Sequence, residues 1–166
     1  MNLPNQLTLA RCFLAAVFVV LMSFPHTATY AVAYVVFTVA AITDYYDGKI
    51  ARRDNLITNF GKLMDPVADK ILMVSAFVMM MRVPELRVPG WTVVAILARE
   101  FLVTGARSLA AADGVVLSAN NYGKAKTVTQ MVWVFVFLAL AILVRLFLPL
   151  FSEETALLLV TWLRGA

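Results

Sequence analysis

The chain has 166 residues, enough for a single domain, and 62% of them are hydrophobic while only 14% are charged. These values lie outside the usual range of soluble globular proteins, so we expect one domain, residues 1–166, embedded in a bilayer. A single cysteine, Cys12, excludes an intrachain disulfide and a CxxC metal or redox site. The net charge of +4 is compatible with nucleic acid, anionic lipid or a phosphorylated substrate. The placement of the charge matters more than its size, and we expect membrane lipids and no nucleic acid as partners.

Apolar segments recur along the whole chain. Spans of about 20 apolar residues are needed for helices that cross a hydrocarbon core of about 30 Å. The expected spans cover residues 7–24, 29–43, 63–81, 91–112 and 128–150, followed by a short segment at 155–163. We therefore expect an all-α, polytopic membrane protein with six transmembrane helices. The sixth is expected to be incomplete because it ends at Ala166 after too few apolar residues, as in a chain truncated at its C-terminus. The second run is short, and we expect its helix to continue through Asp44 and Asp47.

Basic residues are distributed unevenly between the two sides of this topology. One side receives nine and the other three, namely Arg11, Lys49, Arg52, Arg53, Lys62, Lys70, Arg107, Lys124 and Lys126 against Arg82, Arg87 and Arg145. Because Lys and Arg near span ends favour the cytoplasmic side, the N-terminus and the aspartates are expected to face the cytoplasm.

Four carboxylates lie near two adjacent span ends. Each ionised group at bilayer depth costs about 2.5 to 3.5 kcal/mol, so the group needs compensation. At 100° per residue, Asp44 and Asp47 share one arc of the second helix, and Asp65 and Asp69 are one turn apart on the third. Two helices are therefore predicted to present two carboxylates each to a shared cleft.

Clustered carboxylates repel one another unless cations neutralise them. Oxygen ligands suit Mg²⁺ or Mn²⁺, whereas zinc would recruit His or Cys, and magnesium commonly lies between carboxylates and substrate phosphates. Gly48, Ala51 and Gly61 leave room on the same faces, and Arg52 can add a bidentate phosphate contact. The pattern predicts a metal site for a di- or polyphosphate.

Structural alternatives exist for the same residues. Asp44 and Asp47 could pair with basic neighbours at a solvated helix end, and Asp65 could cap a helix that Pro66 begins. The small residues could instead allow close helix packing.

The aspartate pattern is that of a known family. It reads Asp44-Tyr-Tyr-Asp47-Gly48-Lys-Ile-Ala51-Arg52, eight residues, Gly61, three residues, Asp65, three residues, Asp69. This resembles without departure the signature of the CDP-alcohol phosphotransferases, with eight fixed positions in one 26-residue window. Less specific segments, at residues 2–11, 98–101 with Arg107, and 123–127 with Gln130, look like the bacterial phosphatidylglycerophosphate synthases.

The resemblance implies a usually homodimeric, six-span protein of the bacterial inner membrane with a cytoplasm-facing cavity for two metal ions, Mg²⁺ or Mn²⁺, and a CDP-lipid. The implied metal ligands are Asp44, Asp47, Asp65 and Asp69, and Asp69 is also the implied general base. The residues implied around the CDP group are Gly48, Ala51, Arg52, Gly61, Asn5 and Thr8. Asn5, Thr8 and Arg11 share helical spacing, and helix capping or membrane-surface anchoring remain open for them.

The implied reaction transfers a phosphatidyl group from CDP-diacylglycerol to sn-glycerol 3-phosphate and releases CMP. The acceptor phosphate calls for a second cationic site, and the candidates from the fourth span and the loop to the fifth are Arg99, Arg107, Lys124 and Lys126. Three of these could instead be membrane-surface anchors, and Arg99 could pair structurally with Glu100.

Other functions remain open from the sequence. Within the family, inositol phosphate, serine or phosphatidylglycerol could be the acceptor. From a different class, a divalent cation transporter would also carry intramembrane acids, although these lie toward one face only. A catalytically silent scaffold is disfavoured by the intact motif.

Overall fold

The computed structural model describes residues 3–53, 59–113, 121–150 and 161, and within these it contains helices and connecting turns but no strand. Its elements in chain order are α1 (Leu3–Ser23), α2 (Thr27–Arg53), α3 (Asn59–Met80), α4 (Gly90–Ala112), α5 (Asn121–Phe147) and a 3-10 turn, η1 (Leu148–Leu150). The all-α class is confirmed. The expected sixth segment, residues 155–163, lies outside the described residues except for Thr161.

The helices extend beyond the apolar runs that predicted them. As expected, α2 continues through the aspartates to Arg53. Helix α5 begins at Asn121, so Lys124 and Lys126 lie in its first turns and not in a loop, which corrects the sequence-based expectation. A helix satisfies its own backbone hydrogen bonds, so it can continue where the apolar composition stops.

Two ends of the bundle are distinguished below. The end at which α1 begins and α2 ends is called the aspartate end. The opposite end is called the turn end, because the short α1–α2 and α3–α4 connections lie there. Side-chain hydrogen bonds close these connections: Thr29 Oγ1 donates to the carbonyl oxygen of His26 at 2.8 Å, and Thr92 Oγ1 to that of Pro89 at 2.6 Å.

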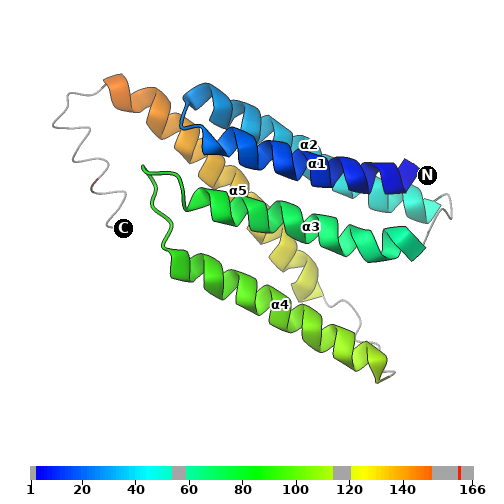
Figure 1. The fold of residues 1–166 in the computed structure, drawn as a ribbon. Helices are drawn as coiled ribbons and strands as arrows, with labels where there is room; N and C mark the ends of the chain where they lie inside the picture. Colours follow the sequence, from blue (N-terminus) through cyan, green and yellow to red (C-terminus); the bar gives the residue numbers. More distant parts are fainter. Residues whose placement is uncertain (1–2, 54–58, 114–120, 151–160, 162–166) are drawn as a thin grey trace.

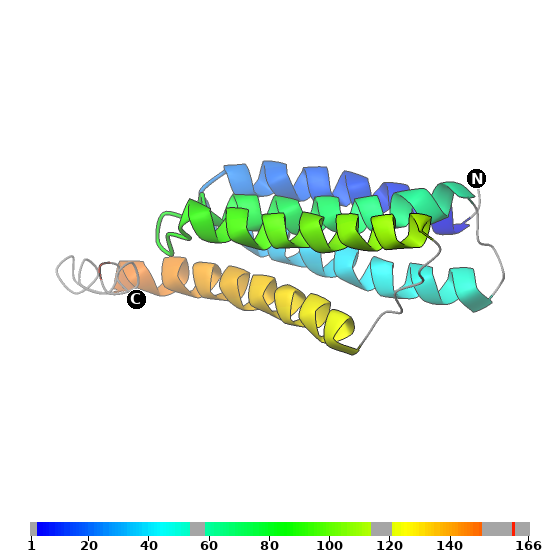
Figure 2. The same cartoon turned by 90° about the horizontal axis from the view of Figure 1, so that it is seen from below.

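Helices α1, α2 and α3 run side by side and pack on one another, and α5 crosses them at an angle against α2 and α3 (Figure 1). Helix α4 contacts α3 but is not closely packed against α5, whose first turns are set apart from it (Figure 2). The bundle therefore has a tight three-helix part and a looser region between α3, α4 and α5.

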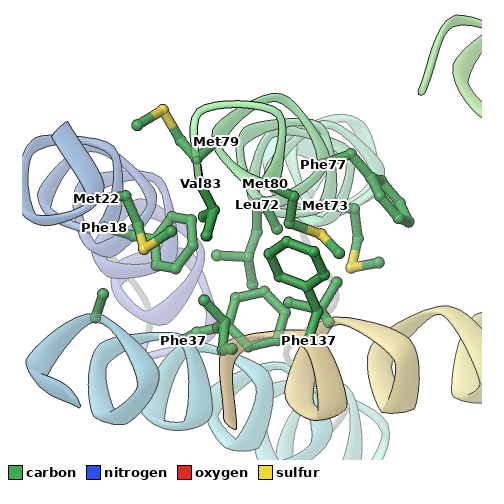
Figure 3. Packing of buried hydrophobic residues seen from close by; sticks show 14 of the residues in the cluster. Phe18, Met22, Phe37, Leu72, Met73, Phe77, Met79, Met80, Val83 and Phe137 are labelled. Atoms are coloured by element: carbon green, nitrogen blue, oxygen red, sulfur yellow. The ribbon is translucent and has the colours of Figure 1, made fainter. Parts of the chain in front are cut away.

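Aromatic and methionine side chains fill the centre of the tight part (Figure 3). Phe37 of α2 lies between Phe18 of α1 and Phe135 of α5, with ring centroids 5.7 Å and 5.2 Å away. Tilted and edge-on ring pairs of this kind add about 0.5 to 1.5 kcal/mol each to the packing.

The outer surface of the described helices is apolar. Large apolar side chains such as Phe13, Trp91, Leu102 and Trp133 are exposed, far beyond what a water-exposed surface usually carries. Two stretches, Gln6–Ser23 and Val128–Phe147, are long and apolar enough to cross a membrane, and Thr27–Thr43 is a shorter apolar stretch. Helices α3 and α4 carry charged residues within their length, and these charges mark the candidate site.

Candidate active site

The buried stripe of α1 becomes polar toward the aspartate end. Its members are spaced alternately three and four residues apart, which places them on one face: Met22, Phe18, Ala15, Arg11 and Thr8. Arg11 is only 1% exposed and Thr8 is fully buried. The alternative that these two residues anchor α1 at the membrane surface is therefore wrong.

Helix α2 repeats this pattern with acids. Tyr30, Ala33, Phe37 and Ala40 form its buried stripe, again at spacings of three and four. The same spacing continues to Asp44 and Asp47 on the same helix. Helices α1 and α2 are antiparallel, and Phe18 of α1 contacts Phe37 of α2. Arg11 precedes Phe18 by seven residues and Asp44 follows Phe37 by seven, so the backbone of Asp44 lies at the level of Arg11.

Helix α3 supplies the second pair of acids. Leu72, Ala76 and Met79 are buried, and Asp69 and Asp65 precede Leu72 in the same register. Because α3 begins at Asn59, Asp65 lies well inside the helix. The alternative that Asp65 caps a helix begun by Pro66 is therefore wrong.

For several of the predicted site residues, the structure describes the backbone and not the side chain. The backbones lie in α1, α2, α3 and α5, but the side chains lie outside the described part of the chain for Asn5, Asp44, Asp47, Gly48, Ala51, Arg52, Gly61, Asp65 and Lys124. Among the side chains that the structure does describe, no three His, Cys, Asp or Glu residues gather into a metal-ligating group.

Asp69 is half-buried and lines a small pocket of about 60 Å³ between α3, α4 and α5. Lys70, Glu100, Phe101 and Gln130 line the same pocket. The Lys70 ammonium nitrogen lies 5.4 Å from the centroid of the Phe101 ring, a cation–π contact between α3 and α4. The structure thus brings the predicted base to a pocket with positive charge around it.

Glu100 of α4 is the centre of a polar network at this pocket. Its Oε1 pairs with the ammonium group of Lys126 and accepts a hydrogen bond from Gln130 Nε2 at 3.2 Å. Arg99 Nη1 lies 3.5 Å from the same oxygen, but its side chain is 56% exposed, so this pair is weak. The Arg99–Glu100 pair, an alternative that the sequence left open, is present, yet the stronger partners of Glu100 come from α5.

Lys126 precedes the apolar stretch of α5 and is crowded by like charges. Partial burial lowers the pKa of its ammonium group, as do Arg99 and Lys70, whereas Asp69 acts in the opposite direction. Of the predicted acceptor-site residues, the structure brings Arg99 and Lys126 together. Arg107, two turns beyond Glu100 on α4, is exposed and makes no side-chain ion pair within the described part of the chain.

An apolar cavity of about 510 Å³ adjoins the small pocket on the side of the turn end. Phe77 and Gln130 line both, and the larger cavity continues between Ile96 of α4 and Trp133 and Phe137 of α5. Polar groups at one end of an apolar cavity suit a ligand with a polar head and an apolar body.

An ion pair at the turn end was not predicted from the sequence. Arg145 Nη2 lies 2.8 Å from Glu85 Oε1, and its Nη1 donates to the carbonyl oxygen of Pro25. Its guanidinium carbon lies 4.5 Å from the centroid of the Tyr30 ring. Arg145 therefore joins α5 to α2, to the α1–α2 turn and to the α3–α4 connection.

Comparison with known proteins matches residues 1–163 to the model of the CDP-alcohol phosphatidyltransferase family. The chain belongs to this family. Several curated relatives are named for the same reaction. The CDP-diacylglycerol–glycerol-3-phosphate 3-phosphatidyltransferase of Bacillus subtilis strain 168 is 38% identical over 143 residues, which cover 79% of this chain and 73% of the relative.

Two further relatives carry related names. The enzyme of Rickettsia bellii with the same name is 41% identical over 132 residues, covering 78% of this chain and 71% of its own. A probable phosphatidylglycerophosphate synthase of Mycobacterium tuberculosis is 40% identical over 134 residues, covering 79% of this chain and 63% of its own.

Family membership bears on the alternatives. The predicted resemblance to the family is confirmed, and a transferase is favoured over a cation transporter. CDP-alcohol phosphatidyltransferases generally use divalent metal ions. The apolar outer surface and the bacterial relatives together indicate a membrane protein.

Proposed function

We propose that this CDP-alcohol phosphatidyltransferase transfers the phosphatidyl group of CDP-diacylglycerol to sn-glycerol 3-phosphate, giving phosphatidylglycerophosphate and CMP. The names of the relatives support the reaction. The observation that carries the assignment to this chain is the register of α1, α2 and α3. The buried stripe of α1 ends in Arg11 and Thr8 at the aspartate end. At the same end, the spacing of the buried residues continues to Asp44 and Asp47 on α2 and to Asp69 and Asp65 on α3, which belong to the family motif.

The proposed topology has six spans in one domain, formed by the five helices and the segment at 155–163. Helix α1 has 21 residues and is about 31 Å long at 1.5 Å per residue, which matches the hydrocarbon core. The aspartate end faces the cytoplasm of a bacterial inner membrane in this proposal, since it carries the basic residues. The active form is proposed to be a homodimer.

The proposed metal site is formed by Asp44, Asp47, Asp65 and Asp69, which would hold two Mg²⁺ or Mn²⁺ ions. The donor set fits, because all four donors are carboxylates and each pair continues the helical spacing of a buried stripe toward the aspartate end. When bound, such ions neutralise the diphosphate and stabilise CMP as a leaving group. Arg11, buried at the level of Asp44, adds fixed positive charge to this region.

Residues of the chain are also proposed to bind the donor and to accept the proton of the acceptor. Gly48, Ala51, Arg52, Gly61, Asn5 and Thr8 are proposed to surround the CDP group. The apolar cavity between α3, α4 and α5 suits an acyl chain of the donor. The hydroxyl oxygen of the acceptor attacks the lipid-side phosphorus, and the bond from that phosphorus to CMP breaks. Asp69 accepts the proton of that hydroxyl.

The acceptor phosphate is proposed to bind at the cationic group beside Asp69. Arg99 and Lys126 are present at the network around Glu100, and Lys124 lies on the same first turns of α5 as Lys126. Arg107 is the weakest candidate because it is exposed away from this network. Charge-assisted hydrogen bonds from these groups would hold a dianionic phosphate.

The test is CMP release by the purified protein in lipid with CDP-diacylglycerol, Mg²⁺ and one acceptor at a time. We expect glycerol 3-phosphate to be used in preference to inositol phosphate, serine and phosphatidylglycerol, and chelation to abolish the reaction. Preference for a non-phosphorylated acceptor would overturn the assignment of the acceptor. Metal uptake into liposomes without CMP release would overturn the enzyme assignment.

A further inference from the structure

We propose that Glu100 is a positioning residue for the acceptor: it holds Lys126 and Gln130 of α5 at the pocket that Asp69 lines. The proposal rests on the proposed function and assigns a role to a residue outside the aspartate motif. It also assigns Gln130 to the acceptor end of the site.

Packing alone does not determine where the first turns of α5 lie relative to α4. The described parts of α4 and α5 are not closely packed (Figure 2). The 510 Å³ cavity lies between them. Across this gap, Glu100 Oε1 receives both the Lys126 ammonium group and the Gln130 amide from α5. Glu100 and Lys126 side chains are each 24% exposed, so both are largely withdrawn from solvent. This bridge therefore sets the position of the α5 cation beside the pocket.

Glu100 could affect acceptor binding in two ways: by holding Lys126 in place, or by neutralising part of the positive charge around the pocket. Arg99, Lys126 and Lys70 place three positive charges around Glu100 and Asp69. By Coulomb's law alone, the negative charge of Glu100 weakens the attraction of this region for a phosphate dianion. Removing that charge would then lower the acceptor KM. If Glu100 instead holds Lys126 in place, removing the charge raises the acceptor KM, so the two effects have opposite signs.

The first experiment is Glu100→Gln, which keeps the shape of the side chain and removes its charge. We expect the KM for glycerol 3-phosphate to rise about tenfold, the loss of one well-placed charged contact. The KM for CDP-diacylglycerol and the thermal midpoint should change little. An acceptor KM that is unchanged or lower would overturn the proposal.

Glu100→Asp and Glu85→Gln complete the set. Glu100→Asp keeps the charge but withdraws it by about 1.5 Å, one carbon–carbon bond, and we expect a smaller rise in the acceptor KM. Glu85→Gln removes a carboxylate from an ion pair at the turn end, and we expect it to affect stability without changing the acceptor KM. A rise in the acceptor KM with Glu85→Gln equal to that with Glu100→Gln would assign the effect to general loosening of the bundle and refute a positioning role.

A double-mutant cycle with Lys126→Gln tests the route of the effect. If Glu100 acts through Lys126, Glu100→Gln should change the acceptor KM less than twofold in the Lys126→Gln background. Full additivity would contradict the proposal. A wild-type protein that releases no CMP with glycerol 3-phosphate would instead refute the proposed function, so the two failures are distinguishable.

Discussion

Two ion-pair clusters, one at the turn end and one beside Asp69, are built from the same kinds of side chain but differ in the ratio of basic to acidic groups. Each joins a carboxylate near or on α4 to a basic residue of α5. At the turn end, one guanidinium meets one carboxylate, a carbonyl oxygen and an aromatic ring. Beside Asp69, one carboxylate meets Lys126, Arg99 and Gln130, and positive charge is in excess.

This difference distinguishes an ion pair that stabilises the fold from a charged group that can bind a ligand. Arg145 and Glu85 side chains are 11% and 14% exposed, and their charges are balanced within the protein. The group around Glu100 lines a pocket and has positive charge left for a ligand. We therefore expect the turn-end pair to govern stability and the Glu100 network to govern the acceptor.

The largest expected effect concerns Asp69. Asp69→Asn should lower CMP formation by a factor of about 10² to 10⁴, the usual contribution of a general base, while the thermal midpoint stays near that of the wild type. The control is Asp113→Asn, because Asp113 is exposed at the end of α4. Near-normal turnover by Asp69→Asn would show that another group takes the proton.

The next largest effect is expected from a substitution that breaks the turn-end ion pair. Arg145→Met should destabilise the protein by about 3 kcal/mol, because Glu85, only 14% exposed, is then left without its counter-charge. Denaturation in detergent, followed by fluorescence, measures it. The double variant Arg145→Met/Glu85→Gln should recover part of the loss. An Arg145→Met protein of normal stability but raised acceptor KM would reverse the roles of the two clusters.

A smaller effect is expected at the start of α5. Lys124→Ala should raise the KM for glycerol 3-phosphate about tenfold, with little change in kcat, if Lys124 binds ground and transition states alike. Steady-state kinetics with each substrate varied in turn measures it. A change confined to CDP-diacylglycerol would move Lys124 to the nucleotide side of the site.

The smallest effect is that of salt. Raising ionic strength from about 0.05 M to 0.3 M should increase the acceptor KM by about twofold to threefold, since the partly exposed group around Glu100 is screened. The thermal midpoint should stay nearly constant because the turn-end pair is largely withdrawn from solvent. A midpoint that falls while the acceptor KM stays constant would contradict the division between the clusters.

Much of the architecture could be predicted from local pattern. The apolar runs located all five described helices, and the continuation of α2 through Asp44 and Asp47 was predicted correctly. The start of α5 at Asn121 was not, because the first turns of that helix are polar. Hydrophobicity reports the apolar layer, whereas helix bounds depend on hydrogen bonding and capping.

The sequence by itself determined the all-helical class, the family and the four aspartates, because helical periodicity and motif spacing are local properties of the chain. Only the tertiary structure decided which partners Glu100 and Arg145 choose. From the sequence, a pair with the neighbour Arg99 was an open alternative for Glu100; that pair is present, and Glu100 also bonds to Lys126 and Gln130, 26 and 30 residues away. Arg145 reaches Pro25 across 120 residues. Such pairs form because the packing angles of α4 and α5 bring distant side chains together, and no local sequence pattern encodes those angles.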